Sequence, residues 1–248
     1  MKKYIADGRY VSLYQIPNFR FLIPEGENID TVQSYAFVLD SVSKVMKRRI
    51  PNIGEISLSI VNIKNDDYPM CVRQTQTIYL NVPVDTWNQT AYQFAHELCH
   101  FAIPNNVPQK IRWIEESICE TASLYFMRQV GQMWNKSGIP FKAKNTKINY
   151  AFLFTQYANN QALKFEVFDL SDHETLSYLE SNCIDRPKNM HLARHLLPIF
   201  TAYPETWHAV PMLCDIHQDT LPEALEAWIR MSPEAARPGL RLIKTLFG

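Results

Sequence analysis

His96, Glu97 and His100 form the pattern His-Glu-x-x-His within a stretch that predicts a helix. On a helix, residues four apart lie on one face, one turn from each other. The two imidazoles therefore point in the same direction and can share one metal ion, with the carboxylate of Glu97 beside them. A match to so short a pattern is by itself only moderate evidence, because the pattern can also occur by chance. The surrounding residues therefore decide how it is interpreted.

The residues before this pattern predict a strand that leads into the helix. Residues 76–82 are rich in β-branched side chains, and Pro83 ends the run. Asp85 or Thr86 can then cap a helix that is expected to reach about Ala102. The strand is expected to lie at the edge of its sheet, where an extended peptide could bind through backbone hydrogen bonds.

A second helix is expected over residues 109–130, with Gly131 near its end, and it carries three glutamates in its first part. Glu116 and Glu120 are four residues apart and share a face, where their like charges repel each other. A cation or a histidine proton between the two carboxylates would relieve that repulsion. Glu115 is typical of an exposed helix start, where acidic residues are favoured.

The other segments predict a small sheet in the N-terminal part and helices toward the C-terminus. Apolar spacing of three and four residues indicates a helix over residues 28–49. Two strands are expected within 9–23 and one within 55–63, and later helices over 188–202, 221–230 and 233–246, the last broken by Pro238. We therefore expect an α+β fold.

The expected domain organisation has two parts. Residues 1–135 would form a catalytic core, with a small mixed sheet and a central helix pair that carries the glutamates and histidines. Residues 136–248 would form a helical lobe that closes a cleft over the core. A length of 248 residues is compatible with two such closely packed lobes.

Composition argues against several other classes of protein. Lys plus Arg total 25 and Asp plus Glu total 25, so the net charge of zero does not favour binding to nucleic acid. No apolar run approaches the roughly 18 residues that a membrane span needs. The five cysteines are widely spaced and include no Cys-x-x-Cys pair, which is not a disulfide framework. We expect a cytoplasmic protein with reduced thiols.

The two segments together resemble the gluzincin branch of the zinc metallopeptidases. The resemblance covers about residues 76–127 and rests on HELCH at 96–100 followed by WIEESICETASLYF at 113–126. In this family the first motif is followed by a helix with tryptophan, an apolar residue, any residue and glutamate. Metzincins, another branch, need Gly and His where this chain has Ile103 and Asn106.

The resemblance implies a Zn²⁺ cofactor, a zincin-type helix pair and a role for each residue. His96, His100 and Glu116 would bind the zinc, and Glu97 would be the general base that activates water to hydrolyse a peptide bond. Glu120 would orient a ligand histidine. Many gluzincins have glycine after the third ligand, whereas this chain has a serine, and the short interval leaves Glu120 open as an alternative third ligand.

Two other hypotheses remain beside a zinc metallopeptidase that acts on a peptide or protein. One is a catalytically inactive zincin-like protein that binds a peptide or protein partner, and the other is a helical interaction protein with an accidental motif. His191 and His195 are also four residues apart and could bind a second metal, although packed core histidines are the more ordinary interpretation. The sequence does not choose the residue that stabilises the oxyanion; the candidates are Tyr150, Tyr157, His191, His195, Tyr203 and His208.

Overall fold

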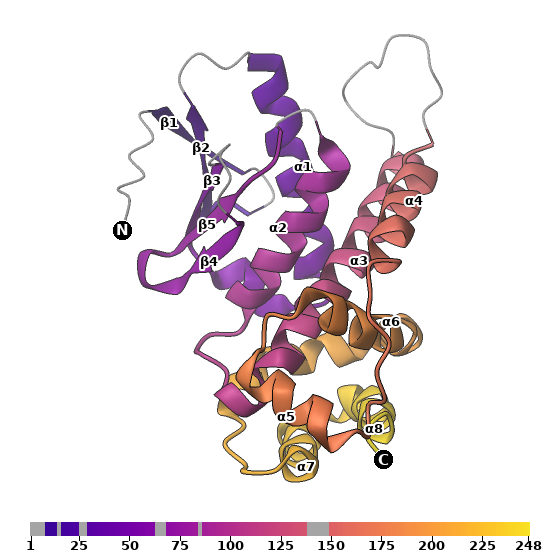
Figure 1. Cartoon of the computed structure of the whole chain (residues 1–248). Coiled ribbons are helices and arrows are strands. Elements are labelled where there is room, and N and C mark those ends of the chain that lie inside the picture. The colour runs from indigo at the N-terminus through magenta and orange to yellow at the C-terminus, as the bar shows by residue number, and fades with distance from the viewer. Residues whose placement is uncertain (1–7, 14–15, 25–28, 63–67, 84–85, 138–148) are drawn as a thin grey trace. The chain divides into compact units, whose positions relative to one another are not determined.

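The structure is a computed structural model that describes residues 8–13, 16–24, 29–62, 68–83, 86–137 and 149–248. This part of the chain is a mixed α/β protein, with a small sheet near the N-terminus and a mostly helical C-terminal part (Figure 1). The coarse fold expected from the sequence is therefore confirmed. No described helix combines the length and the apolar composition that a membrane span needs.

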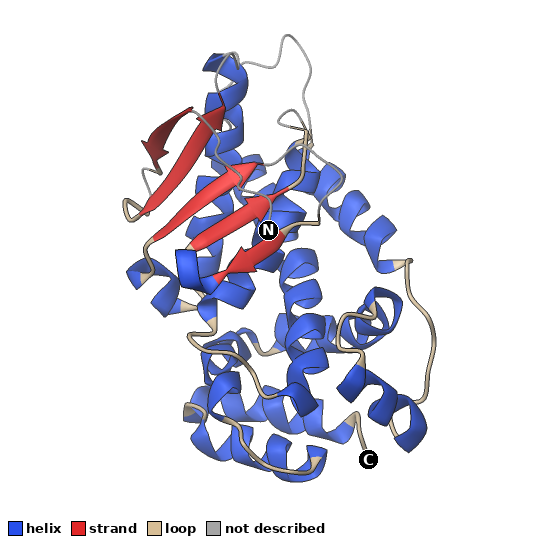
Figure 2. Cartoon of the chain, turned by 60° about the vertical axis from the view of Figure 1, so that its left-hand side comes forward, coloured by secondary structure: helices blue, strands red, loops and turns tan. Residues whose placement is uncertain are grey.

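Within the described residues, the sheet is mixed and contains five strands (Figure 2). Their order is β1-β2-β3-β5-β4; β2, β3 and β5 run parallel to one another, whereas β1 and β4 are antiparallel to their neighbours. The strands are β1 (Gly8–Ser12), β2 (Phe19–Pro24), β3 (Leu58–Asn62), β4 (Met70–Val72) and β5 (Thr77–Leu80).

The expected edge position of the strand before the His-Glu-x-x-His motif is wrong. β5 is hydrogen-bonded to β3 on one side and to β4 on the other. The short strand β4 was not expected, because its three residues follow a proline and carry too short a pattern to signal a strand. Of the described strands, β1 and β4 lie at the edges of the sheet.

Two compact units divide the chain, and each combines separate stretches of sequence. The first contains residues 1–101 and 126–158, and the second contains residues 102–125 and 159–248. These units do not follow a single division after residue 135. The expected catalytic core and cleft-closing lobe stay a prediction.

Helices of the first unit pack on the sheet through aromatic side chains. α1 (Ile29–Lys47) and α2 (Trp87–Ala102) lie on one face of the sheet (Figures 1 and 2). The rings of Phe21 in β2 and Tyr35 in α1 have centroids 4.6 Å apart. Trp134, in the later part of α3 (Arg112–Ser137), donates a hydrogen bond of 2.9 Å from Nε1 to Oγ of Ser41 in α1.

Gly131 does not end the second helix, which corrects the expectation from sequence. α3 continues to Ser137, and α4 (Tyr150–Ala162) passes close to it. A Cβ at position 131 would lie 2.8 Å from the carbonyl oxygen of Tyr150 and 3.0 Å from Cα of Ala151. Glycine is therefore required at this position by the close approach of α4, not by the conformation of a helix end.

The second unit is built from helices around buried tryptophans. α5 (His173–Ser181), α6 (Arg186–Ala202), α7 (Leu221–Met231) and α8 (Arg237–Thr245) follow the end of α4, and residues 204–215 form a 3₁₀ segment. The rings of Phe200 and Trp207 have centroids 4.2 Å apart, and Trp228 donates from Nε1 to the carbonyl oxygen of Ala209 at 2.8 Å.

Pro238 begins a helix and does not break one, contrary to the sequence expectation. It is the second residue of α8, after a 3₁₀ turn at residues 234–236. Proline is favourable in the first turn of a helix because its missing N–H has no partner there in any case. The apolar spacing of the sequence continues across this turn, so the sequence does not indicate where the helix begins.

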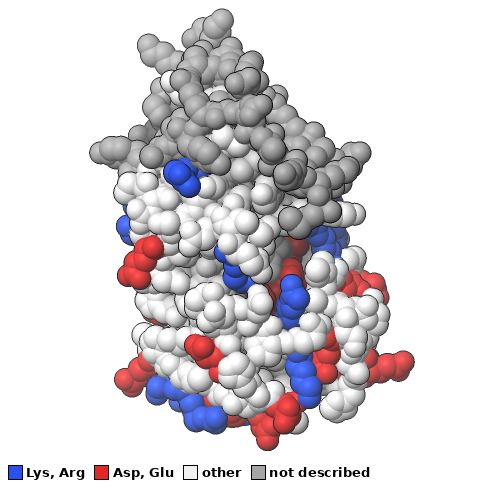
Figure 3. All heavy atoms as spheres, turned by 90° about the vertical axis from the view of Figure 1, so that its left-hand side faces the viewer, with Lys and Arg blue, Asp and Glu red and all other residues white. Residues whose placement is uncertain are grey.

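Charged side chains of both signs are interspersed on the surface. On the face shown in Figure 3, Lys and Arg lie among Asp and Glu, and the described residues of that face form no extended patch of one sign. None of the five cysteines, all within the described residues, forms a disulfide, and four of them are buried.

Candidate metal centre

α2 is fixed to the end of β5 by reciprocal side-chain hydrogen bonds. The backbone N–H of Asn81 donates to Oε1 of Gln93 at 3.1 Å, and Nε2 of Gln93 donates to the carbonyl oxygen of Asn81 at 3.2 Å. Asn62, at the end of β3, pairs in the same way with the backbone of Val82, at 2.6 and 3.2 Å. Because Gln93 lies three residues before His96, these bonds set the position of the motif relative to the sheet.

The beginning of α2 differs in part from expectation. Asp85, one of the two expected capping residues, lies outside the described residues. Thr86 directly precedes the helix, and its carbonyl oxygen accepts from the backbone N–H of Thr90 at 2.9 Å. Its hydroxyl donates to the carbonyl oxygen of Pro83 at 2.6 Å. The Thr86 side chain thus bonds to the preceding loop.

The other end of α2 is bound by an arginine that sequence reasoning missed. Arg73 follows β4, and its Nη2 donates to the carbonyl oxygen of His100 at 2.6 Å. The last carbonyls of a helix lack partners within the helix, and a positive charge is favourable there. Arg73 therefore stabilises the turn that carries His100. An isolated arginine 27 residues away in the sequence gives no signal of this contact.

His96, His100 and Glu116 are brought together by the structure. Each offers one ligand atom, an imidazole nitrogen or a carboxylate oxygen, and all three atoms lie within 4.8 Å of one another. The two imidazole rings have centroids 5.0 Å apart, as expected for histidines one turn apart on a helix. Among the described residues, this is the group of three or more such side chains that could hold a metal ion.

These donors fit zinc. Two imidazoles and one carboxylate are one of the donor sets that catalytic zinc uses, and zinc lies about 2.0–2.2 Å from such ligands. Donors around one zinc are therefore up to roughly 4 Å apart, which small side-chain rotations achieve from the present separations. His96 and His100 are half-buried, and Glu116 is 9% exposed. Three protein donors leave room for a further ligand.

The remaining glutamates near the motif are buried. Glu97 is 4% exposed and Glu120 is 5% exposed. Glu115 is 2% exposed, so its expected place on an exposed helix start is wrong. The cause lies in α3, whose residues 113–127 are all buried, so no polar stripe distinguishes one face. Carboxylates at such positions need hydrogen bonds or charged partners to offset the loss of water.

Hydroxyl groups next to the glutamates of α3 bond within the helix. Oγ of Ser117 donates to the carbonyl oxygen of Trp113 at 2.8 Å, and Oγ1 of Thr121 donates to that of Ser117 at 2.8 Å. These bonds satisfy both buried hydroxyls, and Oγ of Ser117 also lies 3.5 Å from Oδ1 of Asn189. α3 is continuous through Ser117.

The candidates for stabilising negative charge on a substrate lie in different surroundings. Tyr157 is half-buried, and its ring lies 6.0 Å from that of Tyr92, one turn before His96 on α2. The ring of Tyr150 lies 5.3 Å from that of Trp134, and burial raises the pKa of its hydroxyl. Of the other candidates, Tyr203 is exposed and His208 lies 3.8 Å from the carboxylate of Glu205.

His191 and His195 form a second histidine pair, with ring centroids 4.9 Å apart. His191 is buried between the rings of Phe165 and Phe168, and its Nε2 lies 3.0 Å from the carbonyl oxygen of Phe168. Burial and then the neighbouring His195 lower the pKa of His191. No third ligand from the described residues joins this pair. These contacts favour a packing role over a second metal site.

The chain was also compared with known proteins. No family model matches it, and no curated protein or solved structure matches it either.

Proposed function

We propose that this chain is a zinc-dependent metallopeptidase of the gluzincin type. The observation that carries the proposal is the convergence of His96, His100 and Glu116 within 4.8 Å, with Glu97 on the same helix as the two histidines. A chance occurrence of the motif has no reason to bring a third ligand from another helix to the same place.

The residues divide the chemistry among them. His96, His100 and Glu116 would hold the zinc, which would supply polarisation of the scissile carbonyl group and increase the acidity of a water molecule. Glu97 takes a proton from the attacking water and delivers it to the leaving amine nitrogen. Glu120, one turn after Glu116 on α3, helps to orient a ligand by hydrogen bonding.

Two further elements support a peptide as the substrate. The strand β4 lies at an edge of the described sheet, and extended peptides bind other proteins by adding a strand at such an edge. Arg73 joins the end of β4 to the turn that contains His100, so this edge is coupled to the helix of the metal ligands. Tyr92 lies one turn before His96 on α2, and the ring of Tyr157 packs against it. We therefore assign Tyr157 to stabilise the oxyanion that develops on the substrate.

Removal of the metal tests the proposal. Cleavage of a mixture of quenched fluorescent peptides is expected to fall to background after treatment with 1,10-phenanthroline and to return when about one equivalent of Zn²⁺ is added. Mg²⁺ added in the same amount should not restore it, because it prefers oxygen ligands in octahedral geometry. Cleavage that persists in the metal-free protein would show that the site does not catalyse the reaction.

A further inference from the structure

A basic cleft lies between α7 and α8, outside the candidate metal centre. It has a volume of about 510 Å³, within the range of about 300–1,000 Å³ of small-molecule sites. We call it the α7–α8 cleft. Its lining residues are Glu226, Ile229, Arg230, Arg237, Arg241, Lys244 and Thr245.

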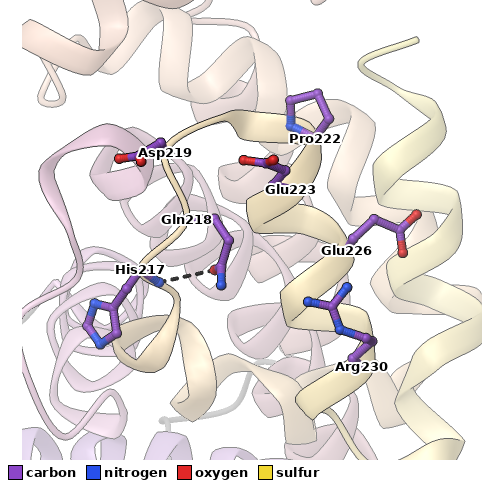
Figure 4. Close-up of a pocket in the computed structure, with 7 residues that line it drawn as sticks. All are labelled: His217, Gln218, Asp219, Pro222, Glu223, Glu226 and Arg230. Carbon is purple, nitrogen blue, oxygen red and sulfur yellow. Dashed lines mark hydrogen bonds between the residues drawn. The ribbon is translucent and has the colours of Figure 1, made fainter.

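The charges of the α7–α8 cleft do not balance. Four cationic side chains line it and one carboxylate, Glu226, opposes them. Lys244 forms an ion pair with Glu226. The neighbouring pocket in Figure 4 shares Glu226 and Arg230, but Asp219 and Glu223 line its other side. Positive charge is therefore concentrated on the side of α7 that meets α8.

The arginines of the cleft differ in how they are held. Arg237 is fixed, because its Nε donates to the carbonyl oxygen of Ser232 at 3.1 Å and its Nη2 to that of Arg230 at 3.4 Å. The side chains of Arg230 and Arg241 are exposed, and within the described part of the chain neither forms a hydrogen bond or ion pair. Two guanidinium groups are thus available to a ligand.

The carboxylate of Glu226 indicates where a negative charge is stabilised. The hydrogen bond and charge of Lys244, followed by the charges of Arg230 and Arg241, hold the pKa of Glu226 below its usual range. The fields of three cations therefore converge on one carboxylate, which neutralises one of them. Like charges that share a cleft repel, and a bound anion of higher charge removes that repulsion.

We propose that the α7–α8 cleft binds a phosphate group, either as free phosphate or as the monoester of a small molecule. Phosphate carries about −1.5 to −2 charges near neutral pH and presents several oxygens to guanidinium forks. The cleft has three more cationic side chains than carboxylates. A ligand with a single carboxylate would neutralise less of that charge than a phosphate group. Ile229 adds an apolar wall that could contact the organic part of a monoester. This site is independent of the proposed zinc chemistry.

Paired charge variants test the phosphate site by calorimetry at constant ionic strength. Arg241→Gln should weaken binding of inorganic phosphate about tenfold or more, because a charged hydrogen bond is lost. Glu226→Gln should strengthen it, because the competing carboxylate is removed and Lys244 is released. The charge-matched controls Arg48→Gln and Glu174→Gln, at exposed positions directly after α1 and on α5, should change it less than about twofold.

Three results would overturn the proposal: no saturable binding of phosphate below about 10 mM, equal effects of the variants and their controls, or tighter binding of glutarate than of phosphate at the same ionic strength. Phenyl phosphate distinguishes the two sources. Tighter binding than that of inorganic phosphate supports a monoester, whereas equal or weaker binding supports free phosphate. Thermal unfolding of each variant confirms that a change in affinity does not reflect loss of structure.

Discussion

Glu97→Gln is expected to lower kcat/KM for peptide cleavage about 1,000-fold while the protein retains about one zinc per chain. Glutamine has nearly the same shape but cannot accept the proton of the attacking water. Glu97 is buried on α2, beside histidines that the substitution leaves in place, so metal binding should survive. The measurement combines single-substrate kinetics with metal analysis of the same preparation.

The matched control for this substitution is Glu174→Gln, which makes the same chemical change at an exposed position on α5. It should cleave the peptide at a rate within about twofold of the wild type. If Glu97→Gln keeps both its zinc and full activity, Glu97 is not the general base. If the wild type and Glu174→Gln both hold zinc but cleave no peptide, the chain is a zincin-like binding protein and the proposed catalysis is wrong.

The third zinc ligand gives the second large expected effect. Glu116→Gln should weaken zinc binding more than 100-fold, because it replaces a charged donor by a neutral amide. Glu120→Gln should weaken it about 10- to 100-fold, as is usual for residues that orient ligands. Competition with a chromophoric zinc chelator measures both affinities. The prediction follows from the structure, which groups Glu116 with the two histidines.

Reversal of that order would make Glu120 the ligand and Glu116 the orienting carboxylate. Because both side chains are buried, either substitution can also change the stability of the fold. Thermal unfolding of the zinc-free proteins separates these effects, since a lost ligand lowers zinc affinity without lowering the stability of the metal-free form. Glu115→Gln, the third buried glutamate of α3, shows how much of the loss comes from burial alone.

Sequence periodicity was sufficient to locate the helix of the motif and the sheet before it. The motif places two donors four residues apart, and α2 ends at Ala102 as expected. The carboxylate donor came from a resemblance of residues 113–126 to a family pattern, not from periodicity. The sequence does not predict its burial, because residues 113–127 of α3 are all buried and no polar stripe indicates an exposed face there.

Contacts between segments distant in the sequence were the part that could not be predicted. Glycine is common at helix ends, so the sequence predicts an end near Gly131, whereas the close packing of α4 explains this glycine. No sequence pattern predicts β4 or the contact made by Arg73. β4 nevertheless pairs with β5, and Arg73 binds the last turn of α2. Gln93 and Asn62 likewise look like ordinary polar residues until their backbone partners are known.

Zinc content tests the central claim most directly. Protein purified without chelator should contain about one zinc per chain, and His100→Ala should contain almost none. Arg73 bonds to the backbone oxygen of residue 100, so the substitution leaves that contact in place. His195→Ala, in the second histidine pair, should keep its zinc. Absence of zinc from the wild type even after zinc is added, or equal zinc in wild type and His100→Ala, would contradict the proposed metal centre.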